Sequence, residues 1–332
     1  MNKIPLSVLD LATVVEGGNP GSAIARTVEV AKHAESLGYK RIWMAEHHNM
    51  EHIASSATSV LIGHVASQTS HIRVGSGGIM LPNHSPLVIA EQFGTLETLY
   101  PGRIDLGLGR APGTDQVTAM ALRRNNIHTV NSFPEDVKQL QTYFSHENSS
   151  ARVRAFPGEG LDIPLWILGS STDSAHLAAQ MGLPYAFAAH FAPAQFWTAI
   201  EIYRKIFSKS RQSQHPYVMA CVNVIAADTD EEAEFLSTSL LKVFIGLVTN
   251  DRKPIQPPGE LPEAYRIPEV RAMVNSMLAC TFVGSRDTIQ KKLNKFITET
   301  HIDELMVSTN IYDKAAKLKS YTILCEAMSC KG

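Results

Sequence analysis

The sequence has few cysteines and no long apolar run, and both shortages limit where the protein is expected to work. Four cysteines occur in 332 residues, and Met1 leads within a few residues into a strand-like run, not a secretory signal. We therefore expect reduced thiols and a cytoplasmic protein. The cysteines are Cys221, Cys280, Cys325 and Cys330. The longest uncharged stretch, 174–200, is interrupted by Gly182, Pro184 and Pro193, so no membrane-spanning helix is expected.

An excess of charge of one sign is also missing. The chain has 30 lysines and arginines against 32 aspartates and glutamates, which gives a net charge of -2 at pH 7. Binding to nucleic acid or to an anionic membrane surface usually needs a basic excess, so neither partner is expected. Apolar residues make up 44% of the chain, enough for a sizeable core. A chain of this length fits one α/β barrel.

Two nucleotide-binding signatures are absent, and one metal signature is present only as a pattern. In the stretch 107–113 the third glycine comes one place too late for a dinucleotide-binding motif, and Pro112 interferes with the helix that must follow. No phosphate loop of the nucleotide-hydrolase type occurs. The stretch 48–52 matches the H-x-x-E-H zinc pattern, which needs both histidines on a helix. A loop is as reasonable there, so a zinc hydrolase remains a remote alternative.

Strand-like and helix-like segments alternate along the chain. The predicted strands cover 4–9, 39–44, 72–81, 103–110, 163–168, 185–189, 217–226 and 304–308. The predicted helices cover 20–37, 58–68, 86–99, 134–144, 172–181, 194–207, 230–243 and 315–328. This alternation predicts a (β/α)8 TIM barrel with insertions, formed by residues 1–332 as a single domain. The segment 246–267 has four prolines and no periodicity, which favours a lid after the seventh strand.

The second predicted strand ends in three polar residues, Glu46, His47 and His48. In a barrel of parallel strands, active sites lie at the carboxyl ends of the strands. A histidine there can transfer protons near neutral pH, but hydrogen-bonded loop histidines would look the same in the sequence. Asp10 and His190 also follow predicted strands, and we expect all of these groups at one barrel mouth. For His190 a structural role is favoured.

Glycines, an arginine and serines follow three other predicted strands. Gly77 and Gly78 stand where a strand prefers branched residues, which indicates either a bulge or a flat ligand lying on the backbone. Arg110 at a site mouth suits a phosphate or a carboxylate. The serines of 170–174 come where a strand passes into a helix, whose free N–H groups suit an anion. Ordinary helix capping by Ser171 or Thr172 is the alternative.

Taken together, these residues resemble the bacterial luciferase-like flavin-dependent monooxygenase family. The resemblance extends over 5–328 and is carried by the stretches 43–48, 74–82, 86–92 and 101–110. Within the family, the chain is most similar to uncharacterised luciferase family oxidoreductases. The resemblance implies a TIM barrel that receives reduced FMN from a separate flavin reductase. It also implies that O2 forms a peroxide at the flavin C4a atom, which oxygenates a small organic substrate.

The resemblance also implies roles for single residues. His47 is expected to be the catalytic residue. The pair Gly77 and Gly78 is expected to form a cis peptide bond beneath the flavin ring. Arg110 and the serines are expected to hold the flavin phosphate. The residues expected to bind the cofactor are Glu46, Gly77, Gly78, Arg110, Ser170, Ser171 and Ser174.

Two departures from the light-emitting enzymes alter the expected activity. Gly109 stands where those enzymes have a reactive cysteine, and Ser170 stands where they have a glutamate in the phosphate site. Light emission is therefore not expected. A deazaflavin-dependent oxidoreductase and a flavin-binding protein without turnover remain as alternatives. We also predict a homodimer. The segments 58–68 and 91–100 carry apolar and small residues on more than one side, and the family resemblance points to dimerisation there.

Overall fold

The computed structural model describes residues 4–123 and 132–329. The strands are β1 (Leu6–Asp10), β2 (Arg41–Met44), β3 (Arg73–Met80), β4 (Ile104–Gly109), β5 (Leu165–Gly169), β6 (Tyr185–Phe187), β7 (Val218–Ala226), β8 (Thr281–Gly284) and β9 (Glu304–Ser308). The α-helices are α1 (Pro20–Ser36), α2 (Thr58–Ser67), α3 (Pro86–Leu99), α4 (Gln116–Arg123), α5 (Phe133–Phe144), α6 (Thr172–Met181), α7 (Phe196–Ile206), α8 (Asp230–Thr249), α9 (Pro268–Met277), α10 (Arg286–Thr300) and α11 (Lys314–Met328). Short 3-10 helices are η1 (Leu81–Asn83), η3 (His146–Ser150), η4 (Pro193–Gln195) and η5 (Glu263–Arg266).

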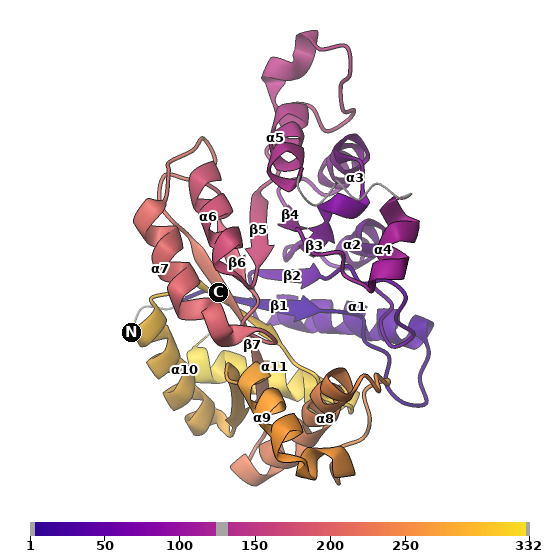
Figure 1. Ribbon diagram of the computed structural model, residues 1–332, viewed down its shortest axis with the longest axis vertical. Coiled ribbons are helices and arrows are strands. Elements are labelled where there is room, and N and C mark those ends of the chain that lie inside the picture. The colour runs from indigo at the N-terminus through magenta and orange to yellow at the C-terminus, as the bar shows by residue number, and fades with distance from the viewer. Residues whose placement is uncertain (1–3, 124–131, 330–332) are drawn as a thin grey trace.

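The strands form a closed parallel barrel. Neighbouring strands follow the order β6-β5-β4-β3-β2-β1-β9-β7, and β6 also pairs with β7, so the ring of pairings is complete. Every pairing between the strands of this ring is parallel. The helices lie outside the strands (Figure 1). The predicted (β/α)8 barrel is therefore confirmed.

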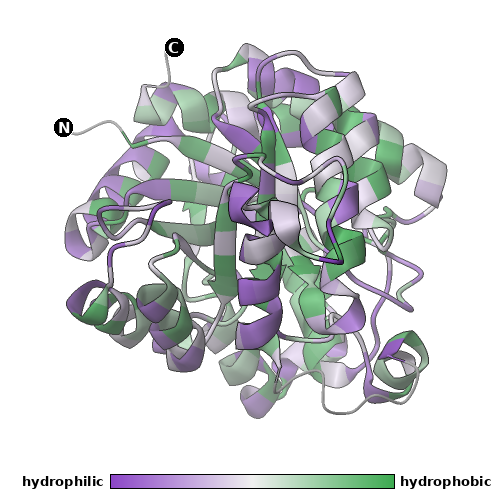
Figure 2. Ribbon diagram, turned by 90° about the horizontal axis from the view of Figure 1, so that it is seen from above, coloured by the Kyte–Doolittle hydropathy of each residue, from purple (hydrophilic) through white to green (hydrophobic). Residues whose placement is uncertain are grey.

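The described residues form three apolar clusters, and two of them are separated because side chains alternate along each strand. In β7, Met219 and Cys221 belong to a cluster inside the barrel, together with Trp43 and Trp166. The intervening valines and alanines of β7 belong to the larger cluster between the strands and the helices. The strands accordingly appear mostly hydrophobic, and the hydrophilic residues lie mainly on helices and loops (Figure 2). This alternation tells us which residues at the strand ends face the barrel axis.

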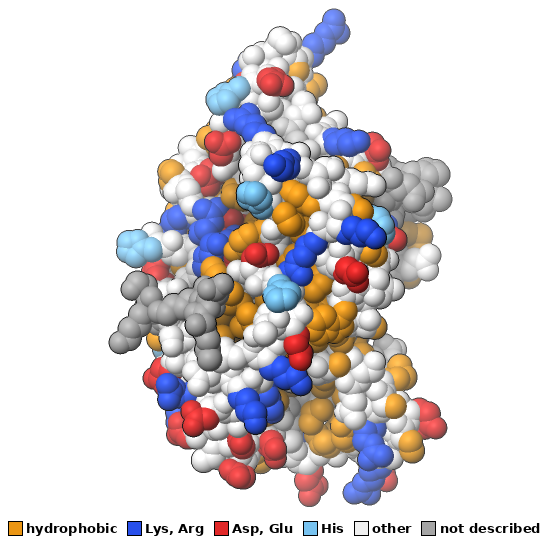
Figure 3. Space-filling model, turned by 90° about the vertical axis from the view of Figure 1, so that its left-hand side faces the viewer, with side chains coloured by type: hydrophobic (Ala, Val, Ile, Leu, Met, Phe, Trp, Pro, Cys, Tyr) orange, Lys and Arg blue, Asp and Glu red, His pale blue; other side chains and the backbone are white. Residues whose placement is uncertain are grey.

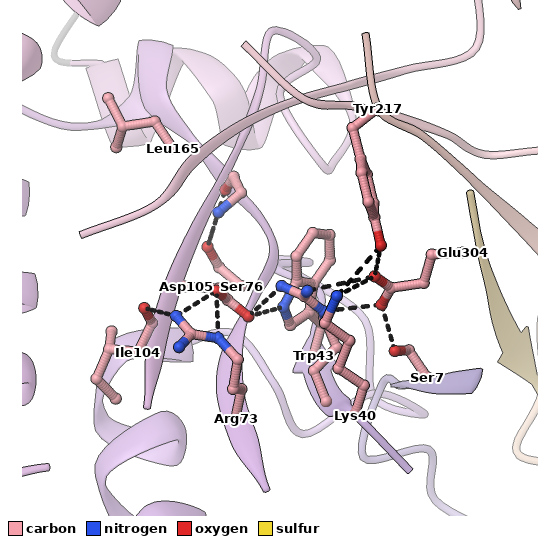
Figure 4. A network of polar contacts seen from close by, with 12 residues as sticks. Ser7, Lys40, Trp43, Arg73, Ser76, Ile104, Asp105, Leu165, Tyr217 and Glu304 are labelled. Carbon is pink, nitrogen blue, oxygen red and sulfur yellow. Dashed lines mark hydrogen bonds and ion pairs between the residues drawn. The ribbon is translucent and has the colours of Figure 1, made fainter. Parts of the chain in front are cut away.

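A buried ionic network closes the amino-terminal end of the barrel (Figure 4). Arg41 lies 2.7 Å from Asp105 and 2.8 Å from Glu304, and both carboxylates are fully buried. Tyr217 donates a hydrogen bond to Glu304 at 2.8 Å, and Trp43 donates to Asp105 at 3.1 Å. Most of these residues lie at or next to the first residues of strands, so the network occupies the end opposite the strand tips. The carboxyl ends of the strands are therefore where a functional site is expected.

The structure contains one strand and three helices that the sequence prediction missed. Strand β8 pairs with the second half of β7, and Asn223 pairs with β8 on one side and with β9 on the other. Four residues of half-buried strand carry little periodic signal. Helix α10 was predictable, because Ile289, Leu293 and Phe296 repeat at helical spacing and are buried. Helices α4 and α9 are the other two missed helices.

The segment expected to be a lid lies against the loops after β1 and β2. Helix α8 extends to Thr249, so the first residues of 246–267 are helical. Further along, Ile255 is buried and exchanges backbone hydrogen bonds with Val14 and Glu16, at 3.0 and 2.8 Å. Burial of one isoleucine stabilises such a docked loop by roughly 1.5–3 kcal/mol. The position at the carboxyl ends of the strands agrees with a lid, whose closing function stays a prediction.

The surface carries no block of one charge on the face drawn in Figure 3, where basic and acidic side chains are intermixed. Among the described residues, no helix combines the length and apolarity needed to cross a membrane. Cys221 and Cys280 are buried free thiols, and Cys325 contacts the backbone carbonyl of Leu37 at 3.4 Å. Cys330, which was also expected to be a reduced thiol, lies outside the described residues.

Candidate active site

His47 lies at the tip of β2 and faces the barrel axis. Trp43 and Ala45 belong to the interior cluster, and His47 continues that alternation. Burial lowers the pKa of His47 to about 4, helped by the neighbouring His48 and His52, although a hydrogen bond to the Ala45 backbone opposes the shift. Its Nδ1 atom is buried and has no partner among the described residues. The imidazole is therefore neutral at pH 7 and able to bind or accept a proton.

Glu46 points away from the axis into a cage of protein donors. Its carboxylate accepts hydrogen bonds from His48 at 2.7 Å, His84 at 2.9 Å, the Met80 backbone at 3.0 Å and Asn83 at 3.2 Å. Burial acts to raise the pKa of Glu46. The hydrogen bonds from the two histidines outweigh this effect and lower the pKa to about 2. Glu46 therefore holds the β2 loop against η1. Direct contact of Glu46 with a cofactor stays a prediction.

The loop that carries His47 is tied to the loop after β4. His48 donates its backbone N–H to the Gly113 carbonyl at 3.1 Å and accepts a bond from the Thr114 hydroxyl at 2.9 Å. Gly113 has a φ of 65°, which favours glycine. Residues 45–57 form no helix, so the histidines of the H-x-x-E-H pattern do not lie one helical turn apart. The zinc interpretation of this pattern is wrong on that geometry.

The glycine pair at the end of β3 has the backbone form that the family resemblance implied. The bond between Gly77 and Gly78 is cis, and the register with β4 shifts between Gly77 and Ile79. A Cβ atom at Gly77 would lie 2.8 Å from the Leu9 side chain, and one at Gly78 would lie 2.6 Å from the Gly107 carbonyl. A bulge and close packing thus explain the glycines. A flavin ring above them stays a prediction.

Arg110 and the start of α6 lie together at the mouth. The Arg110 guanidinium is 3.4 Å from Asp173, which is in the first turn of α6. Ser171 occupies the N-cap position but makes no side-chain capping bond, so the capping alternative does not account for its hydroxyl. Ser170 is half-buried beside it. These residues form the group that the sequence predicted as a phosphate socket.

Ser174 is the member of that group whose hydroxyl is already occupied. It donates to the Ser171 carbonyl at 2.7 Å and pairs with the Tyr185 hydroxyl at 2.9 Å. Gln195 accepts the backbone N–H of Thr172 at 2.9 Å, so one free donor of α6 also has a partner. Ser174 supports the shape of the socket, and its contact with a phosphate stays a prediction.

Asp10 was wrongly expected at the mouth. Leu9 faces the barrel interior, so Asp10 faces outward, where it accepts bonds from Thr27 at 2.8 Å and Lys317 at 2.7 Å. Burial acts to raise the pKa of Asp10, but the Lys317 ammonium and the hydrogen bonds hold it below its usual value. This pair joins β1 to the helices and takes no part in the site.

His190 lies beside His47, although the sequence favoured a structural role for it. Burial lowers the pKa of His190 to about 3, and the charge of a protonated His47 lowers it further, against a hydrogen bond to the Cys221 backbone. Its Nδ1 atom is buried without a partner in the described part of the chain. Sequence reasoning missed His84, Asn83 and Asn223. The first two follow directly after the third strand, and that position was the available signal.

The residues at the mouth fit an anionic, hydrogen-bonding group such as a flavin phosphate and ring. Arg110 and the start of α6 suit the phosphate, and the Nδ1 atoms of His47 and His190 are orphaned polar atoms inside the mouth.

Comparisons with known proteins identify the family. The model of the family described as luciferase-like monooxygenase matches residues 4–304. The chain belongs to the luciferase-like monooxygenase family. A luciferase-like monooxygenase from Escherichia coli K12 is 48% identical over 96% of each chain, and the uncharacterised protein YvbT from Bacillus subtilis is 52% identical over 97% of this chain and 96% of its own.

Solved structures share the fold. The crystal structure of apo-MsnO8 is 34% identical, covers 99% of each chain and gives a TM-score of 0.89. The oxygenating constituent of 3,6-diketocamphane monooxygenase from Pseudomonas putida, solved in complex with FMN, gives a TM-score of 0.74 at 18% identity, over 98% of this chain and 97% of its own. At that identity the likeness shows a common fold.

Proposed function

We propose that this protein is a monooxygenase that uses reduced FMN and O2 to oxygenate a small organic substrate. Two features at one mouth carry the proposal. His47 is a neutral imidazole with a nitrogen that has no partner among the described residues, and Arg110 lies at the start of α6, where it pairs with Asp173. The family membership supports it, as does the FMN complex of a protein with the same fold.

Each part of the mouth has a task in this proposal. Bound reduced FMN supplies two electrons to O2 and makes one oxygen atom available for transfer. Arg110 and the backbone N–H groups of α6 hold the phosphate. His47 is neutral and moves a proton to or from the reacting oxygen. Glu46 fixes the loop on which His47 lies, because its carboxylate joins His48 to His84.

Exclusion of water is the second requirement, since activated oxygen is otherwise released as hydrogen peroxide. The segment around Ile255 is docked on the loop after β1, which itself pairs with the loop after β2, and this position supports a covering role. We propose that this segment is the lid. We also propose that a separate flavin reductase supplies the reduced FMN.

Light emission is not part of the proposal. A Cβ atom at Gly109 would lie 2.8 Å from the Met80 sulfur and 3.0 Å from its methyl carbon. A cysteine at position 109, which the light-emitting enzymes have, would therefore displace Met80. The mouth of this chain is built without that thiol.

We propose that the protein forms a homodimer through α2 and α3. Val60 on α2 is 72% exposed, and Leu99 and Val88 on α3 are 62% and 43% exposed. Large exposed apolar side chains on two neighbouring helices fit a subunit interface. Sedimentation as a monomer at micromolar concentration would contradict this.

Oxygen consumption with photoreduced FMN tests the proposed activity. We expect tight binding of FMN, and consumption of O2 that His47→Ala reduces by about 100-fold, within the usual range for loss of a proton-transfer group. His215→Ala is the matched control, because His215 is exposed on a loop. Equal rates for wild type and His47→Ala would favour a flavin-binding protein without turnover. Binding of a deazaflavin in preference to FMN would favour the hydride-transfer alternative.

A further inference from the structure

Asn223 is a buried amide on the interior side of β7, at the mouth. It is 1% exposed. Met219 and Cys221 face the barrel interior, and Asn223 continues their alternation towards the carboxyl end of the strand. An asparagine in an otherwise apolar strand needs partners for its oxygen and its nitrogen.

The orientation of this amide is fixed by its neighbours. The Nδ2 atom lies 2.5 Å from the His190 carbonyl and 3.2 Å from the Thr281 hydroxyl. Because a carbonyl can only accept, the amino group must lie on that side. The Oδ1 atom is then directed elsewhere, and it is buried with no partner in the described residues.

Three neighbouring residues at the mouth therefore each carry one polar atom without a partner in the described part of the chain. These atoms are the Oδ1 atom of Asn223 and the Nδ1 atoms of His190 and His47, each buried without a partner among the described residues. Asn223 is bonded to the backbone of His190, and the two imidazoles are close enough for the charge of one to depress the pKa of the other. A buried polar atom left without a partner destabilises a fold by about 1–3 kcal/mol. Three of them on neighbouring residues indicate a site preorganised for a ligand.

The chemistry of the wall limits what that ligand is. Asn223 carries no charge, and both histidines are neutral at pH 7 because burial depresses the pKa of each. A charged ligand group would find no counter-ion among these three. The Oδ1 atom only accepts, so the group that faces it must donate a hydrogen bond.

We propose that Asn223 and His190 form a substrate subsite beside His47 that recognises a neutral molecule with an N–H or O–H donor, such as a secondary amide or an alcohol. This rests on the proposed function and narrows its substrate class. Strand β8 has a role in the subsite. Its first residue, Thr281, pairs with Asn223 in the sheet and accepts a hydrogen bond from the Asn223 amino group, which fixes the orientation of the amide.

A pair of probes that differ in one donor tests the proposal. N-Methylacetamide has an amide N–H, and N,N-dimethylacetamide has none. Both are titrated into the FMN-loaded protein labelled with 15N-histidine, and binding is followed by the ring 15N signals of His190 and His47. We expect N-methylacetamide to bind about tenfold more tightly, the size of one hydrogen bond to a buried acceptor, and to shift the His190 signals. Equal affinities, or no shift at His190, would overturn the subsite.

Variants test whether Asn223 causes the preference for N-methylacetamide. Asn223→Leu keeps the branching of the side chain and removes the acceptor, together with the amino group bonded to His190, so it should bind both amides equally while its affinity for FMN stays unchanged. The control is Asn148→Leu, since Asn148 is a buried asparagine far along the chain whose amide donates to Val153 at 3.3 Å. It should keep the tenfold preference. If Asn223→Leu retains the preference, the proposal is wrong. The wild-type comparison needs no variant, and FMN titration of the wild type separately tests the proposed function.

Discussion

Stability between pH 7 and pH 5 should depend on His47. The fold lowers the pKa of this imidazole from 6.5 to about 4, mainly by burial. Between these two values the unfolded chain binds more protons than the folded chain. The stability tied to neutral His47 is therefore complete above about 6.5 and is lost as the pH falls towards 4. Linkage between the two pKa values gives a loss of about 2 kcal/mol between pH 7 and pH 5.

Urea unfolding of wild type and His47→Asn at both pH values measures this contribution. The free energy of unfolding of the wild type should fall by about 2 kcal/mol more than that of His47→Asn, because asparagine does not titrate. His215→Asn, an exposed control, should follow the wild type. If wild type and His47→Asn lose the same free energy, His47 is not held neutral by burial. The argument for its proton-transfer role then loses its physical basis.

Three further predictions follow from other parts of the structure. Arg110→Ala should weaken FMN about tenfold and leave riboflavin unchanged, because the proposed role of this side chain is to bind the phosphate that riboflavin lacks; equal losses in a fluorescence titration would exclude that role. Arg41→Met should lower the free energy of unfolding by about 2–3 kcal/mol in urea, since Asp105 and Glu304 lose their shared cation and keep only Arg73 and Lys40, and a change below about 1 kcal/mol would contradict it. Val60→Asp should give monomers in analytical ultracentrifugation, and an unchanged dimer would place the interface elsewhere.

The sequence predicted the barrel well because its signals are local and repeated. Strand β9 and helix α6 begin and end where they were expected, at Glu304–Ser308 and Thr172–Met181. Buried parallel strands are continuous apolar runs, and glycines and prolines separate them from helices. Strand β8 was missed because it is short and half-buried, and its place is set by pairing with a distant part of β7.

The site could be predicted only as far as strand tips could be identified. His47 and Arg110 follow strand ends directly, and the structure places both at the mouth. Asp10 also follows a predicted strand. Because side chains alternate between the two faces of a strand and Leu9 faces inward, Asp10 faces outward and binds Lys317. Asn223 lies inside a predicted strand, where its polarity was the available signal. Its partners, His190 and Thr281, are far away in the sequence.

A crystal structure of the protein with bound FMN tests the central claim most directly. The account predicts the phosphate on Arg110 and the start of α6, with the ring between His47 and the pair Gly77 and Gly78. A flavin bound elsewhere, or with its phosphate away from Arg110, would contradict the account.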